Sequence, residues 1–185
     1  MKTYLTYGAL LALVGALLTF GLYLTGFHDT TDKLKVAQWI GFAIGLPSGV
    51  ACLALAMRER RNELPAGRTW GYGPAFVAGL ATAGWASFFG AIVSYIYLAF
   101  VNPQMSDLAY QLQIMKLEQK GVPQERIDAA ASMMHRFLTP GVMTISQTIG
   151  GFIGSVLLAL IVAIFFRKAV AAAASSESAT PPPLS

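Results

Sequence analysis

The residue types that most often do chemistry are sparse in this sequence. Its two histidines are His28 and His135, and two carboxylates, Glu125 and Asp128, precede His135 on the same segment. A histidine with nearby carboxylates can bind a metal or exchange protons, but these intervals match no established metal-ligand spacing. We therefore predict no metal site and no cofactor.

Nucleophilic and phosphate-binding chemistry is equally unsupported. Cys52 is the only cysteine, so no internal disulfide or cysteine metal cluster can form. Its apolar neighbours favour a packing role. The glycine-rich residues 69–74 lack the lysine of a phosphate-binding loop, and Trp70 and Tyr72 within them are typical of aromatic anchors at a membrane interface. The sequence contains no serine–histidine–aspartate arrangement, and we predict no catalytic residue.

The elements that would position any site are dominated by apolar residues. Of the 185 residues, 55% are hydrophobic and 12% are charged, about half the usual charged fraction of about 25% in soluble domains. The formal net charge is +4, but the basic residues cluster at the ends of apolar runs. Bilayer topology produces that pattern, whereas nucleic-acid binding needs a basic surface. We expect a protein of the lipid bilayer with no nucleic-acid partner.

Four apolar runs contain no Asp, Glu, Lys, Arg or His, and they cover residues 4–24, 36–57, 75–101 and 142–166. A hydrocarbon core about 30 Å thick needs about 20 helical residues, and a helix satisfies its own backbone amides in lipid. We predict an all-α membrane protein with a four-helix transmembrane domain over residues 1–168 and a disordered cytoplasmic tail over residues 169–185. The first run is too long for the apolar core of a signal peptide, so we interpret it as a retained helix.

The basic residues also predict the orientation. Arg58, Arg60 and Arg61 follow the second run, and Arg167 and Lys168 follow the fourth. Short basic segments stay in the cytoplasm, so we expect both termini to be cytoplasmic. The three arginines could also attract anionic lipid headgroups, although a role in topology alone would explain them.

Residues 102–140 are too polar to span a membrane, yet they carry helical apolar stripes. Asn102 and Pro103 predict the start of a helix, and Gly121 with Pro123 predicts its end. We expect an extracytoplasmic amphipathic helical hairpin between the third and fourth spans. Its predicted partner-binding residues are Met105, Leu108, Leu112, Met115, Met134 and Phe137. The stripes could instead pack on each other or lie among the headgroups.

Glycines recur every four positions in two of the runs, at Gly41, Gly45 and Gly49 and at Gly150 and Gly154. Glycine at this spacing lines one helix face and lets two backbones approach closely. The pattern fits packing within one bundle, and it also fits a homodimer formed through one of these faces.

The polar residues inside the runs are neutral, and the main ones are Gln38, Gln147, Thr148 and Ser155. The absence of an ionisable group there argues against proton-coupled transport, which usually needs a titratable residue in the membrane. Hydrogen bonds between helices would explain these residues. The alternative is that they line a path for a substrate.

Several short motifs follow one another in a characteristic order along residues 1–168. Gly73-Pro74-Ala75-Phe76 opens the third span after a basic segment, Asn102-Pro103 follows that span, and Gly121-Val122-Pro123 lies within the polar pair. In this order the chain resembles the bacterial membrane family DUF4199. The resemblance implies a four-span architecture in a bacterial inner membrane and no known activity, so it assigns no functional residue.

Three functions remain open. We expect a non-catalytic accessory or scaffold protein that forms a homo-oligomer or binds another envelope membrane protein. The alternative is a small dimeric transporter, channel or lipid-handling protein, which the glycine-rich second run and the polar start of the fourth would support. A membrane enzyme acting on a lipid-linked substrate would need His135, Glu125 and Asp128 to converge.

Overall fold

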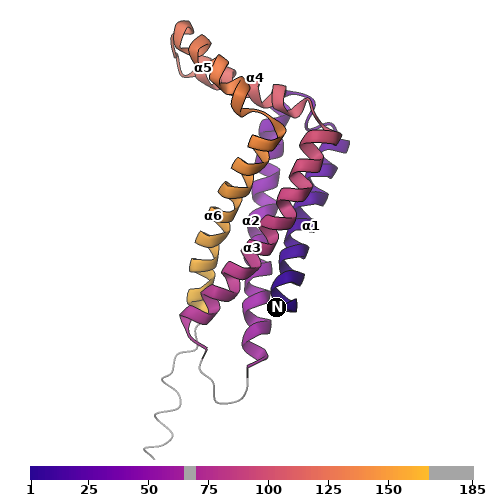
Figure 1. The fold of residues 1–185 in the computed structure, drawn as a ribbon, viewed down its shortest axis with the longest axis vertical. Helices are drawn as coiled ribbons and strands as arrows, with labels where there is room; N and C mark the ends of the chain where they lie inside the picture. Colours follow the sequence, from indigo (N-terminus) through magenta and orange to yellow (C-terminus); the bar gives the residue numbers. More distant parts are fainter. Residues whose placement is uncertain (65–69, 167–185) are drawn as a thin grey trace, which may run out of the picture.

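The structure is a computed structural model that describes residues 1–64 and 70–166. Within these residues every element is helical, and four long helices form a bundle (Figure 1). They are α1 (Lys2–Leu24), α2 (Thr31–Asn62), α3 (Tyr72–Ile96) and α6 (Pro140–Phe166). Counted with the short η1 (Tyr97–Val101) that extends α3, all four are long and apolar enough to cross a membrane. The predicted all-α class is confirmed for these residues, and the four long helices are candidate membrane spans. The predicted tail lies outside the described residues.

The bundle has two distinct ends. The N-terminus, the end of α2, the start of α3 and the end of α6 lie together at what we call the N-terminal end (Figure 1). At the opposite end two further helices, α4 (Met105–Gln119) and α5 (Gln124–Phe137), project away from the bundle (Figure 1). We call this the hairpin end.

The turn between α1 and α2 is fixed by two residues with opposite conformational roles. Gly26 has φ +75°, a left-handed conformation that glycine adopts without steric cost, and it ends α1. Thr30 then caps α2 by accepting a hydrogen bond from the backbone N–H of Lys33 at 3.5 Å. Because the turn is this short, it holds His28 over the hairpin end of the bundle.

The third span changes its helical pitch where it reaches the hairpin end. Residues Tyr97–Val101 form a π-helix, closed by a hydrogen bond from the backbone N–H of Asn102 to the carbonyl of Tyr97 at 2.8 Å. Such segments are rare and frequently occur at functional sites. The structure corrects the predicted start of α4, because Gln104 is its cap. The Asn102 side chain instead donates to the hydroxyl of Tyr97.

The two projecting helices pack mainly on each other, and α4 also contacts α2. Leu112 on α4 and Ile127 on α5 are buried. Met115 approaches α2, where its sulfur lies 3.5 Å from the Lys35 ammonium nitrogen. Phe137, at the end of α5, is 59% exposed.

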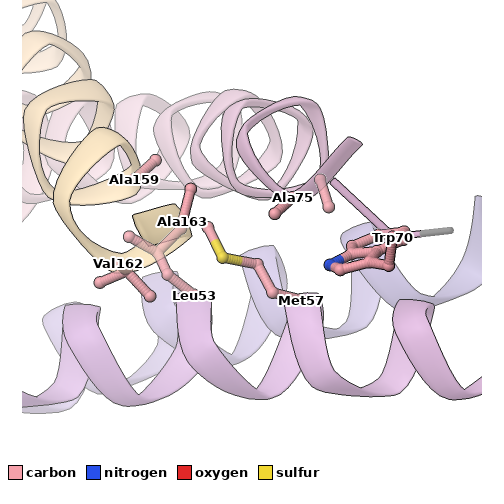
Figure 2. Close-up of a cluster of buried hydrophobic side chains, with 8 residues drawn as sticks. Leu53, Met57, Trp70, Ala75, Ala159, Val162 and Ala163 are labelled. Carbon is pink, nitrogen blue, oxygen red and sulfur yellow. The ribbon is translucent and has the colours of Figure 1, made fainter. Parts of the chain in front are cut away.

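A tight apolar core fills the N-terminal end (Figure 2). Leu53 and Met57 project from α2 toward α3 and α6, and all members of this core are buried. They are Leu53, Met57, Trp70, Ala75, Ala78, Ala159, Val162 and Ala163. Two glycines allow the close approach of helices here. A Cβ on Gly79 would lie 2.6 Å from the Met57 Cε atom, and one on Gly8 would lie 2.6 Å from the Trp85 Cβ atom.

Candidate functional site

A cavity of about 590 Å³ lies among the transmembrane helices in the half of the bundle nearer the hairpin end. Its floor is the contact between α2 and α6, where a Cβ on Gly49 would meet the Leu158 Cδ1 atom at 3.6 Å. Toward the hairpin end, Gly41 and Gly45 line the cavity, and a Cβ on either would meet no neighbouring atom within 4 Å. These two glycines therefore widen a space in which no helix packs against them.

Small residues on all four spans create the cavity. Its smallest lining residues are Ala12, Gly15, Ala16, Ala37, Gly41, Gly45, Gly49, Ala86, Gly90 and Gly151. A helix pair whose facing side chains are all this short leaves space between the two backbones unless the helices move together. Here they are held apart because larger residues pack at both ends of the bundle.

Neutral polar side chains line the cavity at several depths. They are Thr19 on α1, Gln38 on α2, Ser87 and Ser94 on α3, and Gln147, Thr148 and Ser155 on α6. Ser94 donates to the side-chain carbonyl of Gln147 at 3.0 Å. The other five make no side-chain hydrogen bond to any described residue. The cavity thus presents hydroxyl and amide groups that lack protein partners in the part of the chain the structure describes.

The cavity opens sideways, toward the surroundings of the bundle. Gln38 on α2 and Gln147 and Gly151 on α6 line it and are exposed. All three lie on the hairpin-end side of the contact between Gly49 and Leu158. The opening therefore runs between α2 and α6, on a side that faces lipid when the helices span a membrane.

An aromatic cluster closes the cavity at the hairpin end. Tyr97 is 3% exposed, and its ring meets the rings of Phe20 and Tyr23 edge-on with centroids 5.8 Å apart. The Asn102 amide donates to the Tyr97 hydroxyl at 2.9 Å, and that hydroxyl is also hydrogen-bonded to Nδ1 of His28. The Tyr97 oxygen accepts the hydrogen bond from Asn102. The hydrogen of the Tyr97 hydroxyl therefore remains available for donation to Nδ1 of a neutral His28 ring.

His28 also lines a second cavity, on the far side of this cluster. This vestibule has a volume of about 590 Å³, and its polar lining includes Asp29, Asn102, Gln104 and Asp107. Desolvation lowers the pKa of His28, and the nearby charge of Asp29 offsets part of that effect. At neutral pH an uncharged imidazole therefore separates the polar vestibule from the bundle cavity.

At the N-terminal end a polar network ties α1 to the end of α2. Arg60 donates from Nε to the Tyr4 hydroxyl at 3.0 Å and from its terminal nitrogen to Glu63 at 2.5 Å. Thr3 donates to Glu63 at 3.0 Å. The hydrogen bonds from Arg60 and then from Thr3 lower the pKa of Glu63. Tyr7 donates to Glu59 at 2.7 Å.

The three arginines predicted to meet lipid headgroups differ in their surroundings. Arg60 is engaged with Tyr4 and Glu63, as described, and its guanidinium carbon lies 5.8 Å from the centre of the Tyr4 ring. Arg58 is exposed, and Arg61 is partly exposed. Arg60 is therefore part of the contact between α1 and α2, whereas Arg58 has an open environment.

The remaining predicted site residues are spread over the molecule. On α6, Gly150 and Gly154 are exposed outside the cavity, and a Cβ on either would meet nothing within 4 Å. Close packing within one bundle is therefore not made at Gly41, Gly45, Gly150 or Gly154. Self-association through these positions stays a prediction.

The residues predicted to bind a partner on the hairpin do not share one exposed face. Met105 lines the bundle cavity, Leu108 lines the vestibule, and Leu112 is buried. Met134 is partly exposed, and Phe137 is exposed. The apolar stripe of α4 therefore faces the bundle along part of its length.

The described residues contain no group of three or more His, Cys, Asp or Glu side chains placed to hold a metal ion. Asp128 accepts from Gln124 at 3.0 Å, and Glu125 is exposed. The side chain of His135 lies outside the described part of the structure.

The sequence interpretation missed the cavity and the cluster that closes it. Gln38 and Thr148 were recognised as polar, but Thr19 and Ser87 were not, and neither was the pairing of Tyr97 with His28. The signal was present as a repeat of short and polar residues on α6, at Gln147, Gly151 and Ser155. Only the superposition of four such faces makes a cavity, and a single sequence does not reveal which faces meet.

The architecture and the cavity together define a multi-pass α-helical membrane protein with a ligand-sized space between its spans. Residues 6–168 match the model of a family described as protein of unknown function (DUF4199), and the chain belongs to that family. The resemblance found in the sequence is thereby confirmed. No curated protein matches the chain. No solved structure matches it.

Proposed function

We propose that the protein handles lipid, by binding a lipid-like molecule from the bilayer in the cavity between its spans. One observation carries the proposal: an open cavity within the transmembrane bundle is lined by polar side chains, five of which make no side-chain hydrogen bond to a described residue. Its volume of about 590 Å³ falls within the range of about 300–1,000 Å³ that is typical of small-molecule sites.

The membrane surroundings strengthen this argument. A void between helices forfeits the dispersion contacts of its lining atoms, so an empty cavity of this size is unfavourable. Polar groups without partners add a further cost in an apolar environment. A molecule with an apolar chain and a polar group relieves both costs, and a bilayer supplies such molecules at high concentration.

The test is a pair of matched substitutions. Gly45→Leu fills the cavity, whereas Gly150→Leu places the same side chain on the outer face of α6, where it meets no neighbour. We expect native mass spectrometry of the purified protein to detect bound lipid in the wild type and in Gly150→Leu, and to lose it in Gly45→Leu. Equal lipid retention in all three proteins would contradict the proposal.

A second proposal is a non-catalytic accessory or scaffold role in which two copies associate. Its support is the exposed face of α6, where Gly150 and Gly154 are spaced for close helix contact and have open space around them. Here the expected outcomes are reversed. Gly150→Leu should reduce dimer formation in detergent or nanodiscs, and Gly45→Leu should leave it unchanged. A monomeric wild type across the accessible concentration range would reject the self-association.

In the same role, the projecting hairpin presents its exposed residues to another envelope membrane protein. Phe137 and the partly exposed Met134 are the surface that supports this binding. A photo-crosslinking residue at position 137 should trap one partner in cells, whereas the same residue at Leu17, which is exposed in the middle of α1, should trap lipid. Identical products from both positions would oppose a specific partner.

The orientation is proposed from the basic residues. Arg58, Arg60 and Arg61 support a topology in which the N-terminal end of the bundle faces the cytoplasm of a bacterial inner membrane and the hairpin lies outside it. A fused alkaline phosphatase at the C-terminus should be inactive, and one inserted after Gly121 should be active. The opposite pattern of activity would show that the topology is inverted.

Binding of anionic headgroups should depend more on Arg58 than on Arg60.

A further inference from the structure

We infer that the molecule bound between the spans is a long-chain lipid that is uncharged and carries a hydroxyl or carbonyl group. This inference rests on the proposed lipid-handling function and specifies its ligand. It follows from three properties of the cavity: the charges its lining lacks, the polar groups its lining offers, and the depth at which those groups lie.

The lining of the bundle cavity contains no Asp, Glu, Lys or Arg among the described residues. Its two titratable members are His28 and Tyr97, and both lie at the hairpin end. The pKa of His28 is lowered by desolvation, so the ring offers no positive charge at neutral pH. A phosphate, carboxylate or ammonium group placed between the spans would lose its hydration without gaining a counter-charge, which is strongly unfavourable.

A pure hydrocarbon also fits the lining poorly. Thr19, Gln38, Ser87, Thr148 and Ser155 lack side-chain hydrogen bonds to described residues. An alkyl chain alone would leave all these groups unpaired in an apolar environment. A hydroxyl or carbonyl oxygen on the ligand can bind the hydroxyl and amide groups directly, because each of them can donate a hydrogen bond.

The polar groups continue deep into the bundle. On α6 the sequence of lining residues runs from Gln147 and Thr148 to Ser155, one turn before Leu158 at the cavity floor. On α3, Ser87 lies near the middle of the span. The ligand's polar group is therefore accommodated below the membrane surface. Phospholipid headgroups stay at that surface, whereas a neutral oxygen function can enter.

The test uses ligands that share one chain and differ in the head. Oleyl alcohol, oleate and oleylamine are titrated onto the purified full-length protein at a pH of about 9, where the carboxylate and the ammonium are both charged. Bound ligand is counted by native mass spectrometry. We expect oleyl alcohol to bind about tenfold more tightly than either charged analogue. Octadecene, which has the chain without a polar head, should bind more weakly than the alcohol.

Matched variants locate the effect. A protein carrying Thr148→Val and Ser155→Ala should lose the preference for oleyl alcohol over octadecene while still binding both. Ser146→Ala removes an exposed hydroxyl on the same helix outside the cavity and should keep that preference. Retention of the preference in the double variant would overturn the assignment of the polar head to these hydroxyls.

Different outcomes contradict the uncharged ligand class and the lipid-binding cavity. Equal or tighter binding of oleate or oleylamine, with binding still lost in Gly45→Leu, would overturn the uncharged class and leave the lipid-binding cavity standing. Failure of the wild type to bind any of the four ligands would overturn both. A disulfide between two copies carrying Gly45→Cys would also overturn both, because it would show the cavity occupied by a second chain.

Discussion

The two halves of the bundle use the same small residues with opposite results. At the N-terminal end, Gly79 and Gly8 lie directly against Met57 and Trp85, and the helices are in close contact. At the hairpin end, Gly41 and Gly45 face other short side chains across a cavity. A glycine therefore brings helices together only when the opposing helix supplies bulk to fill the space. Where glycine, alanine and serine face one another, the space remains.

This comparison predicts its largest effect at Gly8. Gly8→Ala would put a Cβ 2.6 Å from the Trp85 Cβ and 2.9 Å from the backbone nitrogen of Ala86, which cannot move aside without shifting α3. We expect a loss of about 3 kcal/mol of unfolding free energy. Gly15→Ala, on the same helix but beside the cavity, should be neutral or slightly stabilising, because alanine favours a helix. Denaturation by increasing detergent fraction measures both, and similar losses at the two sites would refute the comparison.

Truncation of the packed core should have the next largest effect. Met57 is buried by α3 and α6 (Figure 2), so Met57→Ala leaves a void. We expect a cost of about 2 kcal/mol, at the lower end of values for buried methionine because lipid is itself an apolar solvent for the unfolded helices. Leu17→Ala, at a lipid-exposed position, should cost well under half of that in the same denaturation assay.

The aromatic cluster that closes the cavity should contribute less. Tyr97→Phe keeps the ring contacts with Phe20 and Tyr23 but removes the hydroxyl that Asn102 and His28 share. We expect a loss of about 1 kcal/mol and faster amide hydrogen exchange in the π-helical segment. Tyr95→Phe alters an exposed tyrosine on the same span and should leave the exchange unchanged. Unaltered amide hydrogen exchange in Tyr97→Phe would show that these hydrogen bonds do not stabilise the end of the cavity.

Acidification should produce the smallest effect, confined to the hairpin end. Burial lowers the pKa of His28 below its ordinary value of 6.5, so the unfolded chain takes up the proton first as the pH falls. The contribution of His28 to the free energy of unfolding is fully present above pH 6.5, and it decreases as the pH falls from 6.5 toward the lowered pKa. Asp29 and, across the vestibule, Asp107 are the carboxylates near the ring, and the charge of Asp29 moderates the shift.

Thermal unfolding at neutral pH and at a pH of about 5 measures this dependence. The midpoint should fall on acidification in the wild type by more than in His28→Gln, which has no group titrating at that position. A midpoint that rises on acidification, or an equal change in both proteins, would be the contrary result.

Much of the fold follows from particular features of the sequence. The uncharged runs predicted the spans, and the structure extends the second of them to Thr31–Asn62 because the charged residues at its ends continue the helix. The glycine pattern was a weaker guide. It singled out Gly41 and Gly150, which meet no neighbour, and passed over Gly8 and Gly79, which make the closest approaches.

The candidate site, like the fold, was only partly predictable from the sequence. Neutral polar residues in the spans were visible, and a substrate-lining role for them was one interpretation. Their alignment around a common space was not visible, because it depends on how each helix is rotated against three others. The hydrogen bonding of Tyr97 with His28 joins residues far apart in the chain, and no local pattern predicts such a contact.

By itself, the sequence determined that four helices are long and apolar enough to cross a bilayer and that the chain resembles its family, since both depend on the composition and order of segments. The tertiary structure decided which small residues pack and which surround a cavity. The physical reason is that packing is a property of two facing surfaces. A helix specifies its own surface through its periodicity, but the size of the side chain opposite belongs to another helix.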